Sequence, residues 1–194
     1  RPAFLGYRGY PYCICTSVND QVVHGFPGEY VLKEGDIIAV DLGVEYGGYY
    51  GDVAATVPVG EVSSLSQRLI ETTQEALKNA INQMRPGRSL SDISATIQEV
   101  VEEEGFSVVR AFVGHGIGQS LHEDPQIPNY GSPGHGPILE EGMVFALEPM
   151  VNAGSWEVKI LPDKWTAVTA DGSLSAHFEH TVAVTKDGPM VLTE

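Results

Sequence analysis

The chain has 194 residues, of which 42% are hydrophobic and 19% are charged, and this composition is that of an ordinary globular protein. The length favours one domain that is large enough to bury a sizeable core. Acidic residues outnumber basic ones by 26 to 11, and the net charge of −15 argues against a nucleic-acid backbone as the partner. No apolar run approaches the roughly 18 residues of a membrane span, and no signal-peptide pattern opens the sequence. The two cysteines, Cys13 and Cys15, are too close together for an ordinary disulfide, so we expect a cytoplasmic protein.

The hydrophobic pattern predicts strands, then two helices, then strands again. Strands are expected within residues 12–23 and 36–59. A helix is expected at residues 64–85, opened by a capping-box pattern at Ser64 and Gln67, and a second helix at residues 91–104. Further strands are expected at 107–113, 143–151, 157–161, 165–169 and 176–185. This order indicates the α+β class, and we expect residues 1–194 to form a single domain.

Asp41 interrupts an apolar run at residues 37–43 that is typical of a strand buried on both faces. A buried, ionised carboxylate is strongly destabilising there unless it is paired or binds a metal. Asp52 lies in the next predicted strand, and a two-residue turn at Tyr46 and Gly47 would place it directly opposite Asp41. Like charges at opposed positions destabilise a strand pair, so we expect a divalent ion between the two aspartates.

Three further polar residues stand out in apolar or glycine-rich segments. His115 lies between two glycines, Glu148 ends an apolar strand, and Glu179 lies inside another. Taken alone, a buried glutamate is more often a structural hydrogen-bond partner, and a Gly-His-Gly sequence is more often a turn. Together with the aspartates, however, they supply four carboxylates and one imidazole, a ligand set that suits Mn, Fe, Co or Zn. Four negative charges balance two divalent ions, so the charge count favours two metals.

Short segments along nearly the whole chain carry a family resemblance: GYRGYP at 6–11, CTSVND at 15–20, VHG at 23–25, Asp41 with Gly51 and Asp52, GHGIG at 114–118, LHEDP at 121–125, EPM at 148–150 and SAHFEHT at 175–181. In this order and spacing they resemble the type I methionine aminopeptidases. The combination is specific, whereas Gly-His-Gly alone would not be. The resemblance implies a pita-bread fold, in which antiparallel sheets covered by helices surround a dinuclear metal site.

The resemblance also implies how the ligands are shared. Asp41 and Asp52 would bind one ion, His115 and Glu148 the other, and Asp52 and Glu179 would bridge the two. Two such ions generate a hydroxide that attacks the scissile carbonyl group, and they stabilise the tetrahedral intermediate.

Roles for further residues follow from the same resemblance. Glu148 would also shuttle a proton, His122 would act at the scissile amide or its oxyanion, and His24 would contact the substrate backbone on the leaving side. By strand parity, His177 shares the face of Glu179 and would support the metal ligands from behind them. His180 would point to the opposite face.

An apolar pocket for the methionine side chain is implied as well, formed by Tyr7, Tyr10, Cys15, Leu121 and Trp165, with Phe4 at its edge. Thioether sulfur contacts aromatic rings favourably, so these walls suit methionine, although each aromatic residue could equally belong to the core. Phe4 and Leu121 depart from the commonest family pattern, which leaves the shape of the pocket open. The resemblance further implies a monovalent cation, Na⁺ or K⁺, held by backbone carbonyls near Asn19, Gln21 and Ser175.

The implied function is removal of the N-terminal methionine from peptides and nascent proteins whose second residue is small. The nearest alternative is an X-Pro aminopeptidase or dipeptidase of the same fold, although those enzymes normally carry a large extra N-terminal domain. The alternative from another class is a catalytically inactive binding module. Family members also carry N-terminal helices that this sequence lacks, so we expect an uncovered apolar sheet face that favours self-association.

Overall fold

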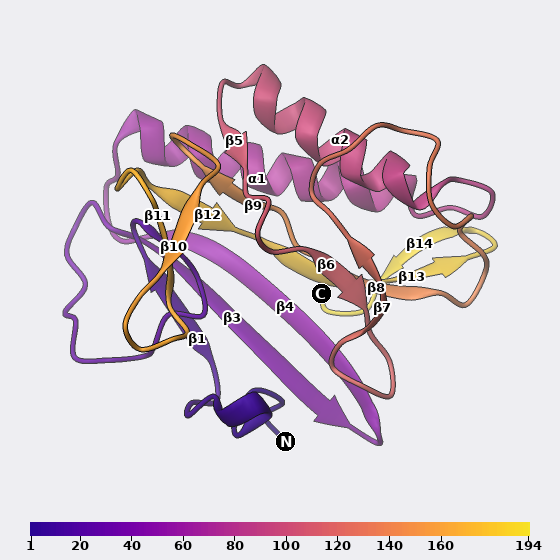
Figure 1. The fold of residues 1–194 in the computed structure, drawn as a ribbon, viewed down its shortest axis with the longest axis horizontal. Helices are drawn as coiled ribbons and strands as arrows, with labels where there is room; N and C mark the ends of the chain where they lie inside the picture. The colour runs from indigo at the N-terminus through magenta and orange to yellow at the C-terminus, as the bar shows by residue number, and fades with distance from the viewer.

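A computed structural model describes all of residues 1–194 and shows two helices packed on one side of a curved antiparallel sheet (Figure 1). Its elements are the 3-10 helix η1 (Tyr7–Gly9), the helices α1 (Ser64–Gln83) and α2 (Leu90–Glu103), and the strands β1 (Cys15–Val18), β2 (Gln21–Val23), β3 (Ile37–Tyr46), β4 (Tyr49–Pro58), β5 (Ser107–Val108), β6 (Gly114–Gly116), β7 (Glu123–Ile127), β8 (Val144–Leu147), β9 (Met150–Asn152), β10 (Val158–Ile160), β11 (Ala167–Thr169), β12 (Ser175–His177), β13 (Glu179–Thr185) and β14 (Gly188–Val191). The expected α+β class is confirmed.

The main sheet has eight strands, in the order β1-β3-β4-β13-β8-β6-β7, with β14 paired to β13. Two smaller sheets, β10-β11-β2 and β12-β9-β5, complete the fold. Strand β13 comes late in the chain but lies between β4 and β8, which come from opposite sides of the helical segment. Distant parts of the sequence therefore meet at the centre of the sheet.

The hairpin of β3 and β4 corrects the expected register. Tyr46 pairs with Tyr49, so the turn consists of Gly47 and Gly48, which have φ angles of 60° and 86°. Tight hairpin turns of this kind need positive φ at both central positions, which glycine adopts without strain. Asp41 therefore faces Ala54, and the prediction that it lies directly opposite Asp52 is wrong. Alternation along the strands still places both carboxylates on one face, two positions apart.

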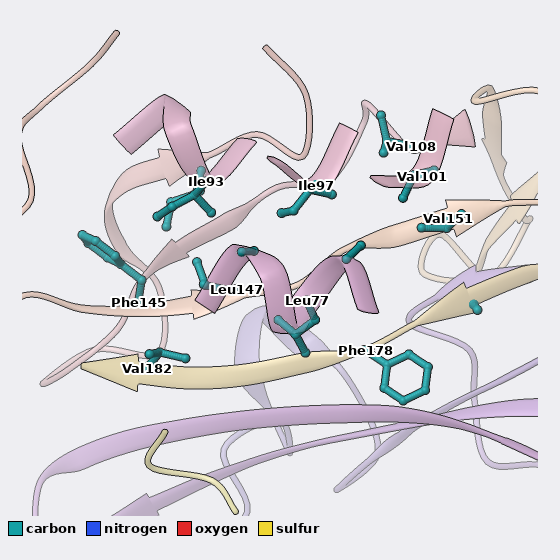
Figure 2. Packing of buried hydrophobic residues seen from close by; sticks show 14 of the residues in the cluster. Leu77, Ile93, Ile97, Val101, Val108, Phe145, Leu147, Val151, Phe178 and Val182 are labelled. Atoms are coloured by element: carbon teal, nitrogen blue, oxygen red, sulfur yellow. The ribbon is translucent and has the colours of Figure 1, made fainter. Parts of the chain in front are cut away.

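Helix α1 begins one residue earlier than its expected capping box implies. Ser63 is the N-cap, and its hydroxyl accepts a hydrogen bond from the backbone N–H of Ser66, so the expected box at Ser64 and Gln67 is wrong. Helix α2 starts with a true capping box formed by Ser89 and Asp92. Helix α1 packs against β8, β13 and α2, and α2 packs against α1, β5 and β7. Figure 2 shows Leu77, Ile93 and Ile97 in the same apolar cluster as Phe145, Leu147 and Val182. This cluster of 22 buried residues is the main core, and it lies between the helices and the strands that they cover.

Several expected strands are interrupted where the chain turns. Asn19, at φ 56°, separates β1 from β2, and Glu148-Pro149 separates β8 from β9. The expected strand at 176–185 divides at Phe178 into β12 and β13, and the strand at 107–113 shortens to β5. Strands β6, β7 and β14 were not expected, because each is short or rich in glycine or proline. None of the helices is long and apolar enough to pass through a membrane.

Candidate metal centre and substrate pocket

A cavity of about 160 Å³ opens where the strands of the main sheet meet the N-terminal segment. It is lined by Phe4, Tyr7, Arg8, Tyr10, Cys15, His24, Asp41, Asp52, His115, Leu121, His122, Glu148, Trp165 and Glu179. The lining includes all five expected metal ligands, both expected catalytic histidines and all six residues of the expected methionine pocket.

The five candidate ligands converge because their strands are neighbours in the sheet. One donor atom each from Asp52, His115 and Glu179 lies within 4.8 Å of the others. The Nε2 atom of His115 lies 3.5 Å from the Oε1 atom of Glu148. Asp41 is buried on the same face of the hairpin as Asp52. The geometry thus collects four carboxylates and one imidazole at one end of the cavity.

The electrostatics of this cluster fit a cation. The Oδ1 atoms of Asp41 and Asp52 and the Oε1 atom of Glu179 are buried without a hydrogen-bond partner. Burial, and then repulsion between the carboxylates, raises the pKa values of Asp41, Glu148 and Glu179 well above the usual carboxyl range. Burial raises the pKa of Asp52 to about 7. A divalent ion satisfies the unpaired oxygens and removes the repulsion, so these residues suit a metal.

The Gly-His-Gly segment is a strand, which excludes the turn as its explanation. Gly114 and Gly116 flank His115 in β6, between β7 and β8. A Cβ atom at Gly114 would collide with the carbonyl oxygen of Ala146, and one at Gly116 would collide with that of Asp124. The Nδ1 atom of His115 lies 2.8 Å from the carbonyl oxygen of Gly116. That oxygen can only accept, so Nδ1 carries the proton and the Nε2 lone pair faces the carboxylates.

The two remaining cavity histidines are neutral near pH 7. Partial burial, and then the neighbouring His115, lowers the pKa of His122 to about 4, and burial lowers that of His24 to about 4. The Nδ1 atom of His122 lies 2.8 Å from the Tyr7 hydroxyl, and the two rings stack at 5.1 Å. His24 has a φ of 60°, and its ring meets that of Phe112 at 5.4 Å, edge to face.

The apolar part of the cavity is a cluster of edge-to-face aromatic rings. The ring of Tyr10 lies 5.0 Å from that of Trp165 and 6.5 Å from that of Phe4. The hydroxyl of Tyr10 donates a hydrogen bond of 3.0 Å to the carbonyl oxygen of Gly25 and so turns away from the pocket. Burial, and then the negative Asp41, raises the pKa of the Cys15 thiol, which keeps it uncharged. These walls offer an apolar side chain no charged partner.

Residues 3–186 match metallopeptidase family M24. The chain belongs to this family. It is 56% identical over 192 residues to methionine aminopeptidase 1 of Bacillus subtilis, covering 99% of this chain and 77% of the relative. It is 54% identical over 192 residues to the methionine aminopeptidase of Clostridium perfringens, with the same coverage.

Among solved structures, the methionine aminopeptidase of Thermotoga maritima superimposes with a TM-score of 0.99 at 54% identity, over 100% of this chain and 78% of that one. This agreement confirms the expected pita-bread fold. The Xaa-Pro dipeptidase of Bacillus anthracis gives a TM-score of 0.72 at 25% identity, over 93% of this chain and only 46% of that one. The M24 relatives therefore favour the methionine enzymes over the X-Pro enzymes.

Other predicted residues of this M24 chain lie outside the cavity lining. His177 is buried behind Glu148 and Glu179, as expected from its parity. His180 points away, and its Nδ1 atom lies 2.9 Å from the hydroxyl of Thr193. The three residues of the expected monovalent-cation site lie near one another. The carbonyl oxygen of Asn19 accepts a hydrogen bond from the N–H of Ser175, and the side chain of Gln21 accepts one from Val18.

Two residues of the site were not predicted. Arg8 is the only lysine or arginine that lines the cavity, and its guanidinium lies 5.4 Å from the centre of the Tyr7 ring. Phe112 contacts His24 from the segment before β6. Arg8 stands between the glycines of the GYRGYP segment, which could have drawn attention to it, whereas Phe112 breaks no sequence pattern.

Proposed function

We propose that this chain removes the N-terminal methionine from peptides and nascent proteins whose second residue is small. The observation that carries the proposal is the joining of a carboxylate–imidazole cluster to an uncharged aromatic pocket in one cavity. Relatives named methionine aminopeptidase, at 56% and 54% identity over nearly the whole chain, support it. We also propose that residues 1–194 act as one catalytic domain and that the protein works in the cytoplasm, where its unpaired cysteines would stay reduced.

The proposed metal content is two divalent ions, drawn from Co, Mn, Fe or Zn. Asp41 and Asp52 would hold one, His115 and Glu148 the other, and Asp52 and Glu179 would belong to both. Bound ions supply a Lewis acid and a means of lowering the pKa of water. A monovalent cation, Na⁺ or K⁺, is proposed near Asn19, Gln21 and Ser175, whose proximity to one another supports the idea.

The remaining chemistry belongs to the side chains of the cavity. The Tyr7 hydroxyl can donate to Nδ1 of His122, which leaves a proton on Nε2 to donate to the carbonyl oxygen as negative charge develops there. Glu148 accepts a proton at one carboxylate oxygen and returns it to the leaving nitrogen. His24 stands beside the second residue of the substrate and limits its size. The aromatic pocket excludes water from the methionine side chain.

A peptide panel tests the proposal. We expect the metal-loaded protein to release the first residue of Met-Ala-Ser much faster than that of Met-Leu-Ser, Leu-Ala-Ser or Ala-Pro-Ser. Norleucine should replace methionine, because exchanging sulfur for a methylene roughly conserves volume. Faster release from Ala-Pro-Ser would favour the X-Pro aminopeptidase. No release from any peptide with any of the four metals would favour an inactive binding module.

A further inference from the structure

His177 is a fully buried polar side chain with an unsatisfied nitrogen. Its side chain is 2% exposed, and its Nε2 atom has no hydrogen-bond partner. The backbone around it is held firmly, because the Thr56 hydroxyl accepts from the N–H of His177 and donates to its carbonyl oxygen, both at 2.8 Å. A buried polar atom without a partner typically costs about 1–3 kcal/mol, so a partner for this nitrogen would stabilise the protein.

The carboxylates nearest to this nitrogen are two of the candidate metal ligands. The Nε2 atom of His177 lies 3.9 Å from Oε2 of Glu148 and 4.0 Å from Oε2 of Glu179. The other oxygen of Glu148, Oε1, is 3.5 Å from Nε2 of His115. Glu148 thus stands between two imidazoles, with one oxygen turned to each. In the proposed arrangement Glu148 serves only the ion on the His115 side, whereas Glu179 is shared by both ions.

We propose that His177 is a positioning residue that donates from Nε2 to the carboxylate of Glu148, its nearest carboxylate, and thereby acts mainly on the affinity of the ion on the His115 side. The inference rests on the two-ion arrangement proposed above. The bond would require the Glu148 carboxylate to rotate so that Oε2, now 3.9 Å away, moves closer to Nε2. The donated bond fixes which oxygen Glu148 presents beside His115. The ion on the Asp41 side has no ligand of its own that His177 touches.

Calorimetric titration of the metal-free protein with Mn²⁺ tests this, without any peptide. The wild type should bind in two steps. His177→Leu, which keeps apolar bulk but removes the donor, should weaken one step about 10–100-fold and leave the other within about threefold, since partners of metal ligands typically contribute that much affinity. His177→Gln retains an N–H donor and should restore most of the lost affinity. The proposal is overturned if His177→Leu binds Mn²⁺ as tightly as the wild type at both steps, or if it loses equal affinity at both steps.

Thermal melting of the metal-free variants separates positioning from a merely structural role. The increase in melting temperature caused by Mn²⁺ should shrink in His177→Leu and be largely restored in His177→Gln. A lower metal-free melting temperature in both variants, with an unchanged increase on adding Mn²⁺, would assign His177 to packing and overturn the proposal. His180→Leu is the matched control. His180 lies three residues further along the chain and points away from the cavity, so both binding steps should be unchanged.

The protonation of His177 in the wild-type protein offers a test that does not depend on the metal affinity of a variant. In the ¹⁵N imidazole spectrum of the Zn²⁺-loaded protein, Nε2 of His177 should carry a proton, with His177→Gln used only to assign the signal. A deprotonated, metal-bound Nε2 would make His177 a direct ligand and overturn the positioning role. None of these measurements involves peptide cleavage. A negative result here would therefore not bear on the proposed removal of methionine, and a negative result in the peptide panel would not prevent these measurements from being interpreted.

Discussion

The imidazole of His122 reaches the cavity with one nitrogen already engaged by the hydroxyl of Tyr7. Its other nitrogen is free to meet the substrate, and the lowered pKa of the ring keeps it neutral at pH 7. A neutral donor that strengthens its bond as charge develops stabilises the transition state more than the bound substrate. The side chain is therefore better suited to lowering the barrier than to tightening ground-state binding.

Accordingly, we expect His122→Ala to reduce kcat far more than it raises KM. Loss of one such donor typically costs about 2.7–4 kcal/mol of transition-state stabilisation, or a factor of about 10²–10³ in kcat. Steady-state kinetics on Met-Ala-Ser would measure both parameters. Tyr7→Phe should show a weaker version of the same pattern, because it removes only the partner of Nδ1. A His122→Ala variant with wild-type kcat would refute the assigned role.

Some residues of the cavity could be predicted from the sequence, and others could not. Asp41 and Glu179 could be predicted because a charged side chain inside an apolar run violates the pattern of a buried strand. Phe112 could not, since a phenylalanine beside a strand violates no pattern, and it joins the site through long-range packing against His24. Arg8 had only the flanking glycines of its segment as a signal, and its place beside Tyr7 depends on the short helix η1.

At the level of elements, the residues of the turn determine the register of the β3–β4 hairpin, which the hydrophobic pattern alone does not determine. The expected order of strands and helices is correct because hydrophobic periodicity marks each element. The predicted register of β3 and β4 was wrong, because it placed the turn one residue too early. Tyr46-Gly47 and Gly47-Gly48 are both plausible turn pairs in the sequence. Alternation cannot select between them, because both registers place Asp41, Asp52 and Ala54 on one face. The turn selects, since glycine adopts the positive φ that both central positions need.

The turn makes a stability prediction. Gly48 has a φ of 86° with no atom near the place a Cβ would occupy, so strain at this position is purely a backbone effect. Gly48→Ala should destabilise the protein by about 1–2 kcal/mol, the usual penalty for an L-residue in this region. Gly48→Asn should cost less, because asparagine tolerates positive φ. Urea denaturation of the metal-loaded protein would measure both changes.

Gly51, in the neighbouring strand, is the matched control. It has no positive φ, and a Cβ there would make an ordinary contact of 3.7 Å with Thr193. Gly51→Ala should therefore leave stability equal or slightly higher, because it restricts the unfolded chain. Equal effects at Gly48 and Gly51 would contradict the backbone explanation.

The outward face of the same hairpin supports a prediction about association. Val44 and Tyr46 on β3 are 43% and 86% exposed, and Tyr49, which pairs with Tyr46 from β4, is 61% exposed. Contiguous exposed apolar surface favours association, so this chain should form dimers or larger species at high concentration. Val44→Lys combined with Tyr46→Lys should shift the population towards monomer in size-exclusion chromatography with light scattering. Ile160→Lys, at an equally exposed apolar residue of β10, should not, and a monodisperse wild-type monomer would refute the prediction.

For the whole molecule, the buried carboxylates make stability depend on pH in a metal-sensitive way. A carboxyl group whose pKa is raised on folding stabilises the protein below its unfolded pKa, and that contribution is lost as pH rises through the folded value. Asp52, with a pKa of about 7, and Asp41, Glu148 and Glu179, with pKa values raised well above the usual range, all act this way. The buried histidines, whose pKa values are lowered on folding, make stability rise with pH instead. They do so only below the ordinary histidine pKa of 6.5.

The metal-free protein should therefore melt at a lower temperature at about pH 8 than at about pH 6.5. The increase in melting temperature on adding Mn²⁺ should grow over the same interval, because ions bind the deprotonated carboxylates. Scanning calorimetry of chelator-treated protein, with and without Mn²⁺, would measure both trends. A metal-free melting temperature that rises across the interval would contradict the burial of ionisable carboxylates in this cluster.

The position of β13 has a consequence for how the protein is made. This strand carries Glu179, lies at the centre of the sheet between β4 and β8, and follows both of them in the chain. During synthesis, the hairpin that carries both aspartates leaves the ribosome more than a hundred residues before the strand that joins it to the rest of the sheet. Until then, the two halves of the sheet expose unpaired central edges, and the metal ligands belong to separate pieces. A site that uses all five candidate ligands can therefore form only after β13 has been synthesised and has paired with β4 and β8.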